Sequence, residues 1–346
     1  MTDQYDVTVV GGGPAGLSTA LYTTRLGRDT AVINRGGGRA AMMLDTHNVI
    51  GVTEDVSGNE FLSTAIEQIE DYGADYIQDF VTEIEETDDG YRITAGSTEV
   101  VTDAVVLATG FSDGHPDPPL PRTGMGLHYC LHCDAYMFVD EPVYVMGTGD
   151  SAAYVAMIML NFTPDVDILT RGDDIEWSAE TAEMLENHPI EVIETEIDGM
   201  EKDDDGWLRA FEFEDGTRRE YRGGFPMYGS NYNTDLAESL GVELTDGGEI
   251  DVDDHGRTNV DGVYAVGDVT PGHNQIPVAM GQGAKCGIAI HMSQREFPRS
   301  IEEIEESGAV TEADIPGISE RLRQRANAHE SGPPSTDGQT TPADDD

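Results

Sequence analysis

The pattern of apolar residues near the start of the chain predicts a strand, a helix and a second strand. Residues 5–10, Tyr-Asp-Val-Thr-Val-Val, form a run typical of a buried parallel strand, and residues 17–26 carry apolar side chains at helical spacing. The apolar run Ala31-Val32-Ile33 then closes a β-α-β unit.

The same order recurs in the middle of the chain. Residues 142–146, Pro-Val-Tyr-Val-Met, predict a strand, residues 152–160 predict an apolar helix, and residues 166–169 predict the next strand. Both strand-to-helix turns are rich in glycine: Gly11-Gly12-Gly13-Pro14-Ala15-Gly16 and Gly147-Thr148-Gly149-Asp150-Ser151-Ala152. The pattern therefore predicts an α/β protein with two similar folding units.

Each glycine of the first turn has a physical reason in a dinucleotide site. Gly11 makes the tight turn, Gly13 lets the backbone approach a pyrophosphate, and Gly16 lets the helix pack on the strand. The helix N-terminus supplies free N–H groups and partial positive charge to the phosphates. The turn predicts nucleotide binding, and the alternative is a glycine turn with a structural role only.

The net charge of the chain restricts its expected cellular setting and its expected binding partners. The 346 residues include 68 Asp and Glu against 19 Lys and Arg, for a formal net charge of -49. Such a surface repels nucleic acid and anionic membranes. It suggests the cytoplasm of a halophile, where concentrated salt screens self-repulsion, and an acidic mesophilic protein is the alternative.

Cysteine usage points to redox chemistry. The first predicted strand begins at Tyr5, and no run of about 18 apolar residues occurs, so we expect a soluble protein that is not exported. Three cysteines in a cytoplasmic chain do not make a structural disulfide framework. The close pair Cys130 and Cys133 is therefore predicted to be redox-active or metal-binding, with Cys286 left over.

Zinc is the competing use of this pair. His128, Cys130, His132 and Cys133 lie within six residues, a run too short to wrap a tetrahedral ion. Structural zinc sites join two separated pairs, and the sequence has no second pair, so we expect no metal.

Two later segments carry a resemblance to a known class. Residues 104–110, Ala-Val-Val-Leu-Ala-Thr-Gly, and residues 258–268, ending in Ala-Val-Gly-Asp, resemble the later fingerprints of the flavoproteins with two dinucleotide-binding domains. The resemblance implies that Asp268 binds the ribityl chain of FAD. It also implies two Rossmann-like domains, the second inserted into the first: residues 1–113 and 242–300 around FAD, residues 114–241 as the inserted domain, and residues 301–346 as an acidic extension. Hinges near residues 113 and 242 would let the domains rotate.

Within these flavoproteins, residues 4–298 resemble the low-molecular-weight thioredoxin reductases. That family carries Cys-x-x-Cys-Asp directly before the second glycine turn, as do Cys130, Cys133 and Asp134. Residues 46–51 resemble its flavin-contacting loop, and residues 274–276 resemble the Arg-Gln pair that opens its last helix, although Asn274 replaces the arginine. The segment also resembles the fungal dithiol oxidases. The FAD-binding residues implied by the resemblance are Gly11, Gly13, Pro14, Ala15, Gly16, Asn34, Asn48, Val81, Ala108, Thr109, Gly110, Gly267, Asp268, Gln275 and Ile276.

The resemblance also assigns roles to the dithiol. Cys133 faces the flavin, Cys130 exchanges with the external disulfide, and Asp134 returns a proton to a leaving thiolate. His132 could lower a thiol pKa if charged, but we expect an exposed histidine without a role.

The motif expected to bind a nicotinamide nucleotide departs from that of the family, which leaves two possible electron donors. The family places a basic cluster after the strand at 166–169, whereas only Arg171 stands here, beside Asp173 and Asp174. The implied NAD(P)H-binding residues are Gly147, Gly149, Asp150, Ser151, Ala152 and Arg171. A domain that no longer binds nucleotide, with electrons from reduced ferredoxin or passed to oxygen, is the alternative.

The sequence therefore predicts an FAD-dependent thioredoxin-disulfide reductase of the cytoplasm that acts on a thioredoxin-like protein and forms a homodimer by family resemblance. A dithiol oxidase and a flavin-bound redox sensor without turnover are the alternatives. Residues 301–322 could form one amphipathic helix, and residues 331–346 are expected to be disordered.

Overall fold

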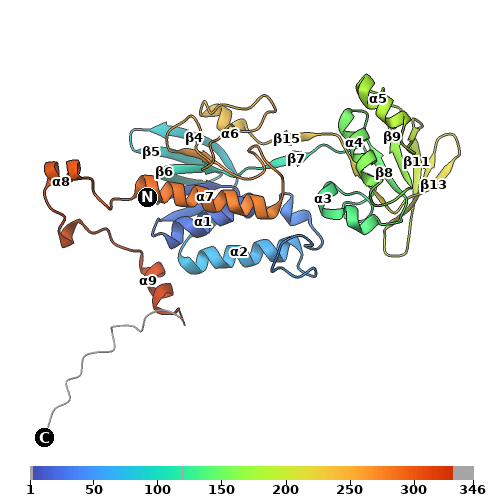
Figure 1. Ribbon diagram of the computed structural model, residues 1–346. Coiled ribbons are helices and arrows are strands. Elements are labelled where there is room, and N and C mark those ends of the chain that lie inside the picture. Colours follow the sequence, from blue (N-terminus) through green and yellow to red (C-terminus); the bar gives the residue numbers. More distant parts are fainter. Residues whose placement is uncertain (1–2, 119, 330–346) are drawn as a thin grey trace, which may run out of the picture. The chain divides into compact units, whose positions relative to one another are not determined.

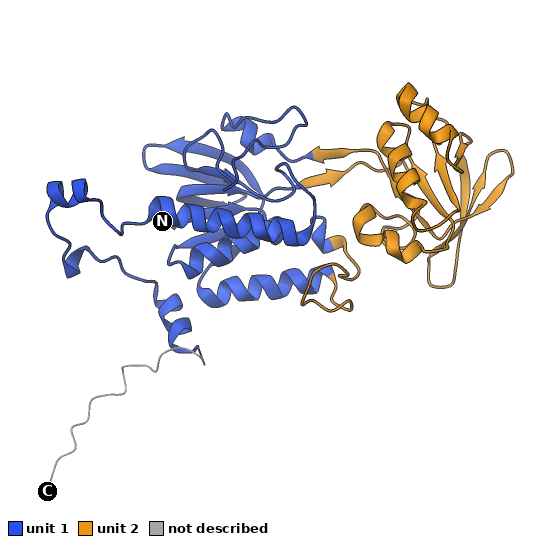
Figure 2. Ribbon diagram, viewed as in Figure 1, with its two compact units in different colours: residues 1–41, 58–110, 232–346 blue, residues 42–57, 111–231 orange. Residues whose placement is uncertain are grey.

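The computed structural model describes residues 3–118 and 120–329, and the chain divides into two compact units (Figures 1 and 2). Unit 1 comprises residues up to 41, 58–110 and 232 onward, and unit 2 comprises residues 42–57 and 111–231. The mixed α/β fold has a Rossmann-like parallel sheet in each unit, and residues 111–231 are inserted between two segments of unit 1.

The sheet of unit 1 joins seven strands among the described residues, in the order β3-β2-β1-β6-β5-β4, with β16 also on β6. Strands β3, β2, β1, β6 and β16 are parallel, and β4 and β5 add an antiparallel hairpin on the first half of β6. The strands are β1 (Asp3–Val10), β2 (Thr30–Ile33), β3 (Asp75–Ile77), β4 (Val81–Thr87), β5 (Gly90–Ala95), β6 (Thr98–Leu107) and β16 (Val263–Ala265).

Helices α1 (Pro14–Arg25), α2 (Gly58–Tyr72) and α7 (Ile276–Gln294) cover one face of this sheet. Val7 and Val9 of β1 pack into the core beneath the helices, while Val10 points into the core on the opposite face, so both faces of the strand are buried. Burial on both faces explains why the second half of β1, residues 7–10, carries apolar side chains toward both sides of the sheet. The helices of unit 1 are α1 (Pro14–Arg25), α2 (Gly58–Tyr72), α6 (Asp235–Ser239), α7 (Ile276–Gln294), α8 (Ile301–Ser307) and α9 (Glu320–Asn327), with the 3-10 turns η1 (Ala40–Met42) and η3 (Glu312–Asp314).

Unit 2 contains a parallel sheet in the order β10-β9-β8-β14 and an antiparallel sheet in the order β11-β12-β13. Val143 and Val145 of β8 pack against helix α4, while Tyr144 and Met146 face the core shared with the antiparallel sheet. Its strands are β7 (Phe111–Asp113), β8 (Val143–Met146), β9 (Val166–Leu169), β10 (Glu191–Ile193), β11 (Ile197–Lys202), β12 (Leu208–Phe213), β13 (Arg218–Glu220), β14 (Gly223–Pro226) and β15 (Ser230–Tyr232). Its helices are α3 (Leu131–Asp134), η2 (Ala135–Phe138), α4 (Asp150–Met159) and α5 (Ala179–Glu186).

The chain passes between the units where β7 pairs with β15, at residues 110–111 and 231–232. The second passage lies earlier than the predicted boundary at 242, because residues 232–241, including α6, pack with unit 1. Residues 42–57 group with unit 2, although the resemblance placed them in the FAD domain.

The prediction of one helix over residues 301–322 is wrong. Gly308, at φ +91, ends α8, and Pro316 and Gly317 separate η3 from α9. The side-chain hydroxyls of Ser300 and Ser319 cap two separate helices instead. The disorder predicted for residues 331–346 lies outside the described residues.

Among the residues that the structure describes, no helix has the length and apolar character needed to cross a membrane.

Candidate functional site

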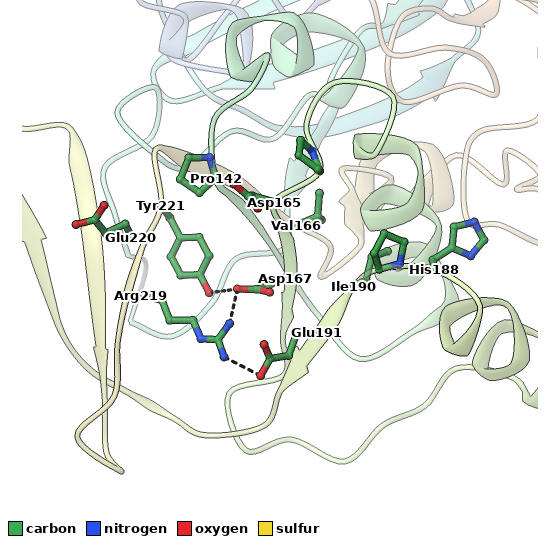
Figure 3. Close-up of a pocket in the computed structure, with 12 residues that line it drawn as sticks. Pro142, Asp165, Val166, Asp167, His188, Ile190, Glu191, Arg219, Glu220 and Tyr221 are labelled. Carbon is green, nitrogen blue, oxygen red and sulfur yellow. Dashed lines mark hydrogen bonds and ion pairs between the residues drawn. The ribbon is translucent and has the colours of Figure 1, made fainter.

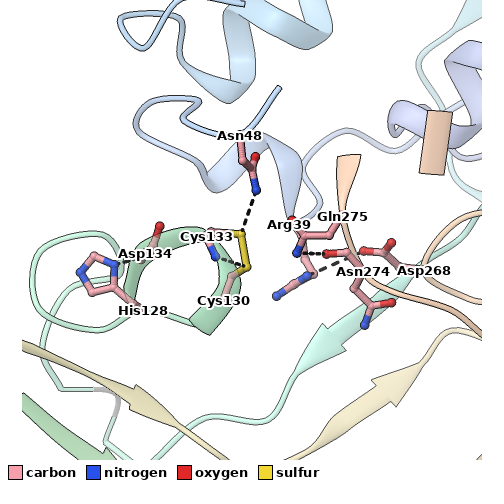
Figure 4. The surroundings of a disulfide bond; sticks show 9 residues. All are labelled: Arg39, Asn48, His128, Cys130, Cys133, Asp134, Asp268, Asn274 and Gln275. Carbon is pink, nitrogen blue, oxygen red and sulfur yellow. Dashed lines mark hydrogen bonds and ion pairs between the residues drawn. A yellow bond between two sulfur atoms is a disulfide. The ribbon is translucent and has the colours of Figure 1, made fainter. Parts of the chain in front are cut away.

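Cys130 and Cys133 form a disulfide at the start of helix α3, with their Cα atoms 5.2 Å apart (Figure 4). Cys130 has extended backbone angles and occupies the N-cap, so its Sγ accepts the Cys133 N–H at 3.1 Å. The Asp134 N–H donates to the Cys130 carbonyl at 3.1 Å. The buried Ala135 and Phe138 of η2 anchor the turn in the core of unit 2. The fold thus brings the predicted dithiol together as a disulfide.

Asp134 has a partner that the sequence did not reveal. Its Oδ2 lies 2.8 Å from Nδ1 of His128, whose side chain is only 4% exposed. His128 figured in the sequence only as a zinc candidate. Within residues 3–118 and 120–329, no three His, Cys, Asp or Glu side chains are placed to hold a metal ion. The spacing His-x-Cys-x-x-Cys-Asp is the signal that could have found this contact.

Residues 42–57 bring a further predicted residue to the dithiol. The Asn48 side-chain amide Nδ2 lies 3.5 Å from Cys133 Sγ (Figure 4). His47 helps to place this loop, because its ring meets Tyr136 edge to face at 5.8 Å and its Nε2 lies 2.6 Å from Asp45. His132, in contrast, is exposed.

The first glycine turn, in unit 1, has the shape of a dinucleotide cradle. Gly11 has φ +116, and a Cβ there would lie 2.2 Å from the Ala108 carbonyl oxygen. A Cβ on Gly16 would lie 2.0 Å from the Gly11 carbonyl oxygen. At Gly13, the N-cap of α1, no described heavy atom lies within 4 Å of an added Cβ. Two glycines permit close packing and the third leaves open space, which fits the approach of a pyrophosphate.

Most of the other residues implied for FAD follow the carboxyl ends of parallel strands or open α7, whereas Val81 begins the antiparallel strand β4. Asn34 follows β2 and donates from Nδ2 to the Tyr76 hydroxyl at 2.8 Å. The Asp268 carboxylate lies 3.7 Å from the Arg39 guanidinium (Figure 4), a partner that the sequence interpretation missed. The remaining members are Pro14 and Ala15 at the start of α1, Val81 with its side chain in the core, Ala108, Thr109 and Gly110 after β6, Gly267 after β16, Gln275 at the N-cap of α7 and Ile276 at its first position.

Thr109 is held firmly in this arrangement. Its hydroxyl donates to the Asn233 carbonyl at 2.8 Å, and its own carbonyl accepts from the Asn233 amide at 2.9 Å. Together with the open space at Gly13, these positions fit a bound FAD, and ligands of open α/β sheets lie at this edge.

The second glycine turn has the same backbone design. Gly147 has φ +142, Gly149 has no described heavy atom within 4 Å of an added Cβ, and Ala152 is buried in the first turn of α4. Asp150 and Ser151 are exposed at its N-terminus. Asp150 Oδ1 accepts the backbone N–H of Ser178 at 2.7 Å, and this bond lowers the pKa of the Asp150 carboxyl.

Arg171 does not present a free guanidinium. Its Nε and Nη2 lie 2.9 and 2.8 Å from Glu196 Oε1, Nη2 lies 3.3 Å from the Asp117 carbonyl, and the side chain is 8% exposed. The Glu176 N–H donates to the Thr148 carbonyl at 2.9 Å, which holds the loop after β9 against the glycine turn. A bidentate contact to a 2′-phosphate would require Arg171 to leave its carboxylate partner.

A hollow at the amino ends of β8, β9 and β10 contains none of the predicted site residues (Figure 3). Asp167 there accepts from the Tyr221 hydroxyl at 2.7 Å and pairs with Arg219 at 3.2 Å, while Arg219 also pairs with Glu191 at 2.7 Å. Burial raises the pKa of the Asp167 carboxyl. Asp167, Arg219 and Glu191 thus pair with one another, and the lining includes no thiol and no glycine turn.

Comparison with known proteins places this arrangement in a family. A sequence profile of the pyridine nucleotide-disulphide oxidoreductases matches residues 5–283. The chain is 32% identical over 297 residues to one component of the alkyl hydroperoxide reductase of Staphylococcus epidermidis, covering 83% of this chain but only 58% of that relative. It is 30% identical over 308 residues to thioredoxin reductase of Peptoclostridium litorale, covering 83% of this chain and 96% of the relative.

A solved structure agrees. Thioredoxin reductase from Streptococcus pyogenes superimposes with a TM-score of 0.77 at 27% identity, over 85% of this chain and 100% of that one. The chain therefore belongs to the pyridine nucleotide-disulphide oxidoreductase family, and within it the chain is similar to the thioredoxin reductases.

Proposed function

We propose that this flavin disulfide oxidoreductase reduces the disulfide of a small thioredoxin-like protein through Cys130 and Cys133. The observation that carries the proposal is the disulfide at the N-cap of α3, followed directly by Asp134. The relative from Peptoclostridium litorale, of which the chain spans 96%, is a thioredoxin reductase, and this supports the choice of partner. When bound, FAD supplies the two electrons that open the disulfide.

The two thiols have different surroundings, which supports different roles. Asn48 belongs to the loop that resembles the family's flavin-contacting loop, and it approaches Cys133, so we assign Cys133 to the flavin side. Cys130 is the exchanging thiol, because the Cys133 N–H that its sulfur accepts would stabilise a thiolate. Unit 1 would hold FAD, and unit 2 would carry the dithiol.

The exchange balances in atoms and electrons. The Cys130 thiolate attacks one sulfur of the partner disulfide, that S–S bond breaks, and the leaving sulfur takes a proton from Asp134. Cys133 then gives its proton to Asp134 and attacks Cys130 Sγ. The second partner sulfur leaves with that proton, the partner is reduced, and the Cys130–Cys133 disulfide forms again.

Two features of the second glycine turn and its surroundings bear on the identity of the electron donor. Gly149 leaves room for a pyrophosphate, which supports a nicotinamide nucleotide. Arg171, engaged with Glu196, argues against a strong preference for NADPH over NADH, and reduced ferredoxin stays the alternative donor. Association into a homodimer and a cytoplasmic, high-salt setting stay predictions from the resemblance and the charge.

Anaerobic reduction of the flavin in molar salt tests both the electron donor and the transfer of electrons to thioredoxin. The FAD-loaded protein is mixed with NADH, NADPH or reduced ferredoxin while flavin absorbance is followed, and oxidised thioredoxin is then added. We expect at least one donor to bleach the flavin and thioredoxin thiols to appear. Cys130→Ser should keep flavin reduction but form no thioredoxin thiols. Failure of all three donors, or thiol formation by Cys130→Ser, would contradict the proposal.

A further inference from the structure

His128 is fixed in place by both its backbone and its ring. Its N–H donates to the Gly224 carbonyl of β14 at 2.9 Å. Its ring lies edge to face on Phe138 at 5.1 Å, stacks over Trp207 at 6.0 Å and tilts against Phe225 at 6.3 Å. The imidazole therefore has one orientation, set by the core of unit 2.

The two ring nitrogens have opposite surroundings. Nδ1 faces Asp134 Oδ2 at 2.8 Å, whereas Nε2 is buried without a hydrogen-bond partner in the described part of the chain. A proton on Nε2 would leave a buried N–H unpaired, at a cost of about 1–3 kcal/mol. The geometry therefore favours the tautomer with its proton on Nδ1, which donates to the Asp134 carboxylate.

This hydrogen bond holds a carboxylate that lies partly exposed at the end of a short helix. Asp134 is 20% exposed and ends a helix of a single turn. A general acid contributes only when it lies within hydrogen-bond reach of the atom it protonates. Because the His128 Nδ1–H binds Oδ2 of Asp134, the other carboxylate oxygen, Oδ1, is left to carry the transferred proton.

We propose that His128 is a positioning residue for disulfide exchange, holding Asp134 beside the dithiol through the Nδ1–H to Oδ2 bond. The proposal rests on the role of Asp134 in the proposed function. His128 touches neither sulfur in the contacts described above, so it acts through Asp134.

Two small-molecule disulfides, used as substrates, distinguish a positioning role of His128 from a purely structural role. Bis(2-hydroxyethyl) disulfide releases an alkyl thiolate that needs a proton. 5,5′-Dithiobis(2-nitrobenzoate) releases a far more acidic aromatic thiolate, which leaves without one. Variants are loaded with FAD, reduced with dithionite and mixed anaerobically with each disulfide, and the rate of flavin or thiol oxidation is measured.

His128→Phe keeps an aromatic ring against Trp207 but removes the donor. We expect it to slow exchange with the alkyl disulfide by about tenfold, part of the roughly 10²–10⁴ that a general acid contributes, and to leave the aromatic disulfide unaffected. His128→Asn, whose amide N–H replaces Nδ1–H, should restore most of the rate. His132→Asn, at an exposed position of α3 beside Asp134, is the matched control.

A double-mutant cycle completes the test, because residues that act as a unit are not additive. In an Asp134→Asn background, His128→Phe should cause no further loss. Equal slowing of both disulfides, an additive loss, or an unchanged rate with the alkyl disulfide would overturn the role of His128. If Asp134→Asn leaves the rate of exchange with the alkyl disulfide unchanged, Asp134 is not the general acid of the proposed function. If His128→Phe does not fold, the decision rests on His128→Asn: failure to keep at least a third of the wild-type rate overturns the positioning role.

Discussion

The glycines of the first turn allow a matched test of which positions serve the fold and which serve the cofactor. A Cβ on Gly16 would lie 2.0 Å from the Gly11 carbonyl oxygen and 3.0 Å from Val9 Cγ1. Ordinary contacts between heavy atoms lie near 3.5 Å, so α1 would have to move by roughly 1.5 Å away from β1. Gly13 has extended backbone angles that any residue adopts, and an added Cβ there meets no described atom within 4 Å.

These distances predict opposite outcomes for two alanine substitutions. Gly16→Ala should destabilise the protein without FAD by about 1–3 kcal/mol, the usual range for overpacking. At about 2–4 °C per kcal/mol, that lowers the Tm by several degrees. Gly13→Ala should leave the Tm unchanged without FAD, yet raise the Kd for FAD at least tenfold, or about 1.4 kcal/mol, because its methyl group occupies the approach of the pyrophosphate.

Thermal unfolding of the apo variants and FAD titration by flavin fluorescence measure the two effects separately. Wild-type FAD affinity in Gly13→Ala would refute the placement of the pyrophosphate on this turn. Equal loss of stability in both variants would refute the distinction between packing and binding.

Three further predictions follow from the site. Releasing Arg171 with Glu196→Gln should raise the preference for NADPH over NADH by about fivefold, or 1 kcal/mol, in steady-state assays; an unchanged ratio would show that Arg171 does not meet the nucleotide. Cys130→Ser should show a long-wavelength charge-transfer absorption from a thiolate beside oxidised flavin, and Cys133→Ser should not; the reverse spectrum would exchange their roles. Burial raises the pKa of the Cys286 thiol, so alkylation of the reduced native protein should modify the other two cysteines alone until denaturant is added, and mass spectrometry counts the adducts.

Local patterns predicted the scaffold well. The strand predicted at residues 166–169 is β9, and the strand predicted at 5–10 lies within β1, because strands buried on both faces are rich in apolar residues. The roles of the glycines were also predicted, because they depend on local structure. Gly11 adopts a positive φ, and Gly16 allows close approach of the backbone.

Side-chain contacts set by tertiary packing were not predicted. His128 reaches Asp134 because β14 anchors its backbone, and Arg171 meets Glu196 across 25 residues. Neither pairing has a periodic signal. In the C-terminal region, helical spacing suggested one helix, but Pro316 and the serine caps were stronger local determinants.

The proposed function requires that electrons pass between FAD and the Cys130–Cys133 disulfide. Anaerobic dithionite titration of the FAD-loaded protein tests it directly, because each redox centre takes up two electrons. We predict that the wild-type protein consumes four electrons per FAD and that the Cys130→Ser, Cys133→Ser double variant consumes two. A wild-type protein that is fully reduced by two electrons would contradict the account, since its disulfide would then be isolated from the flavin.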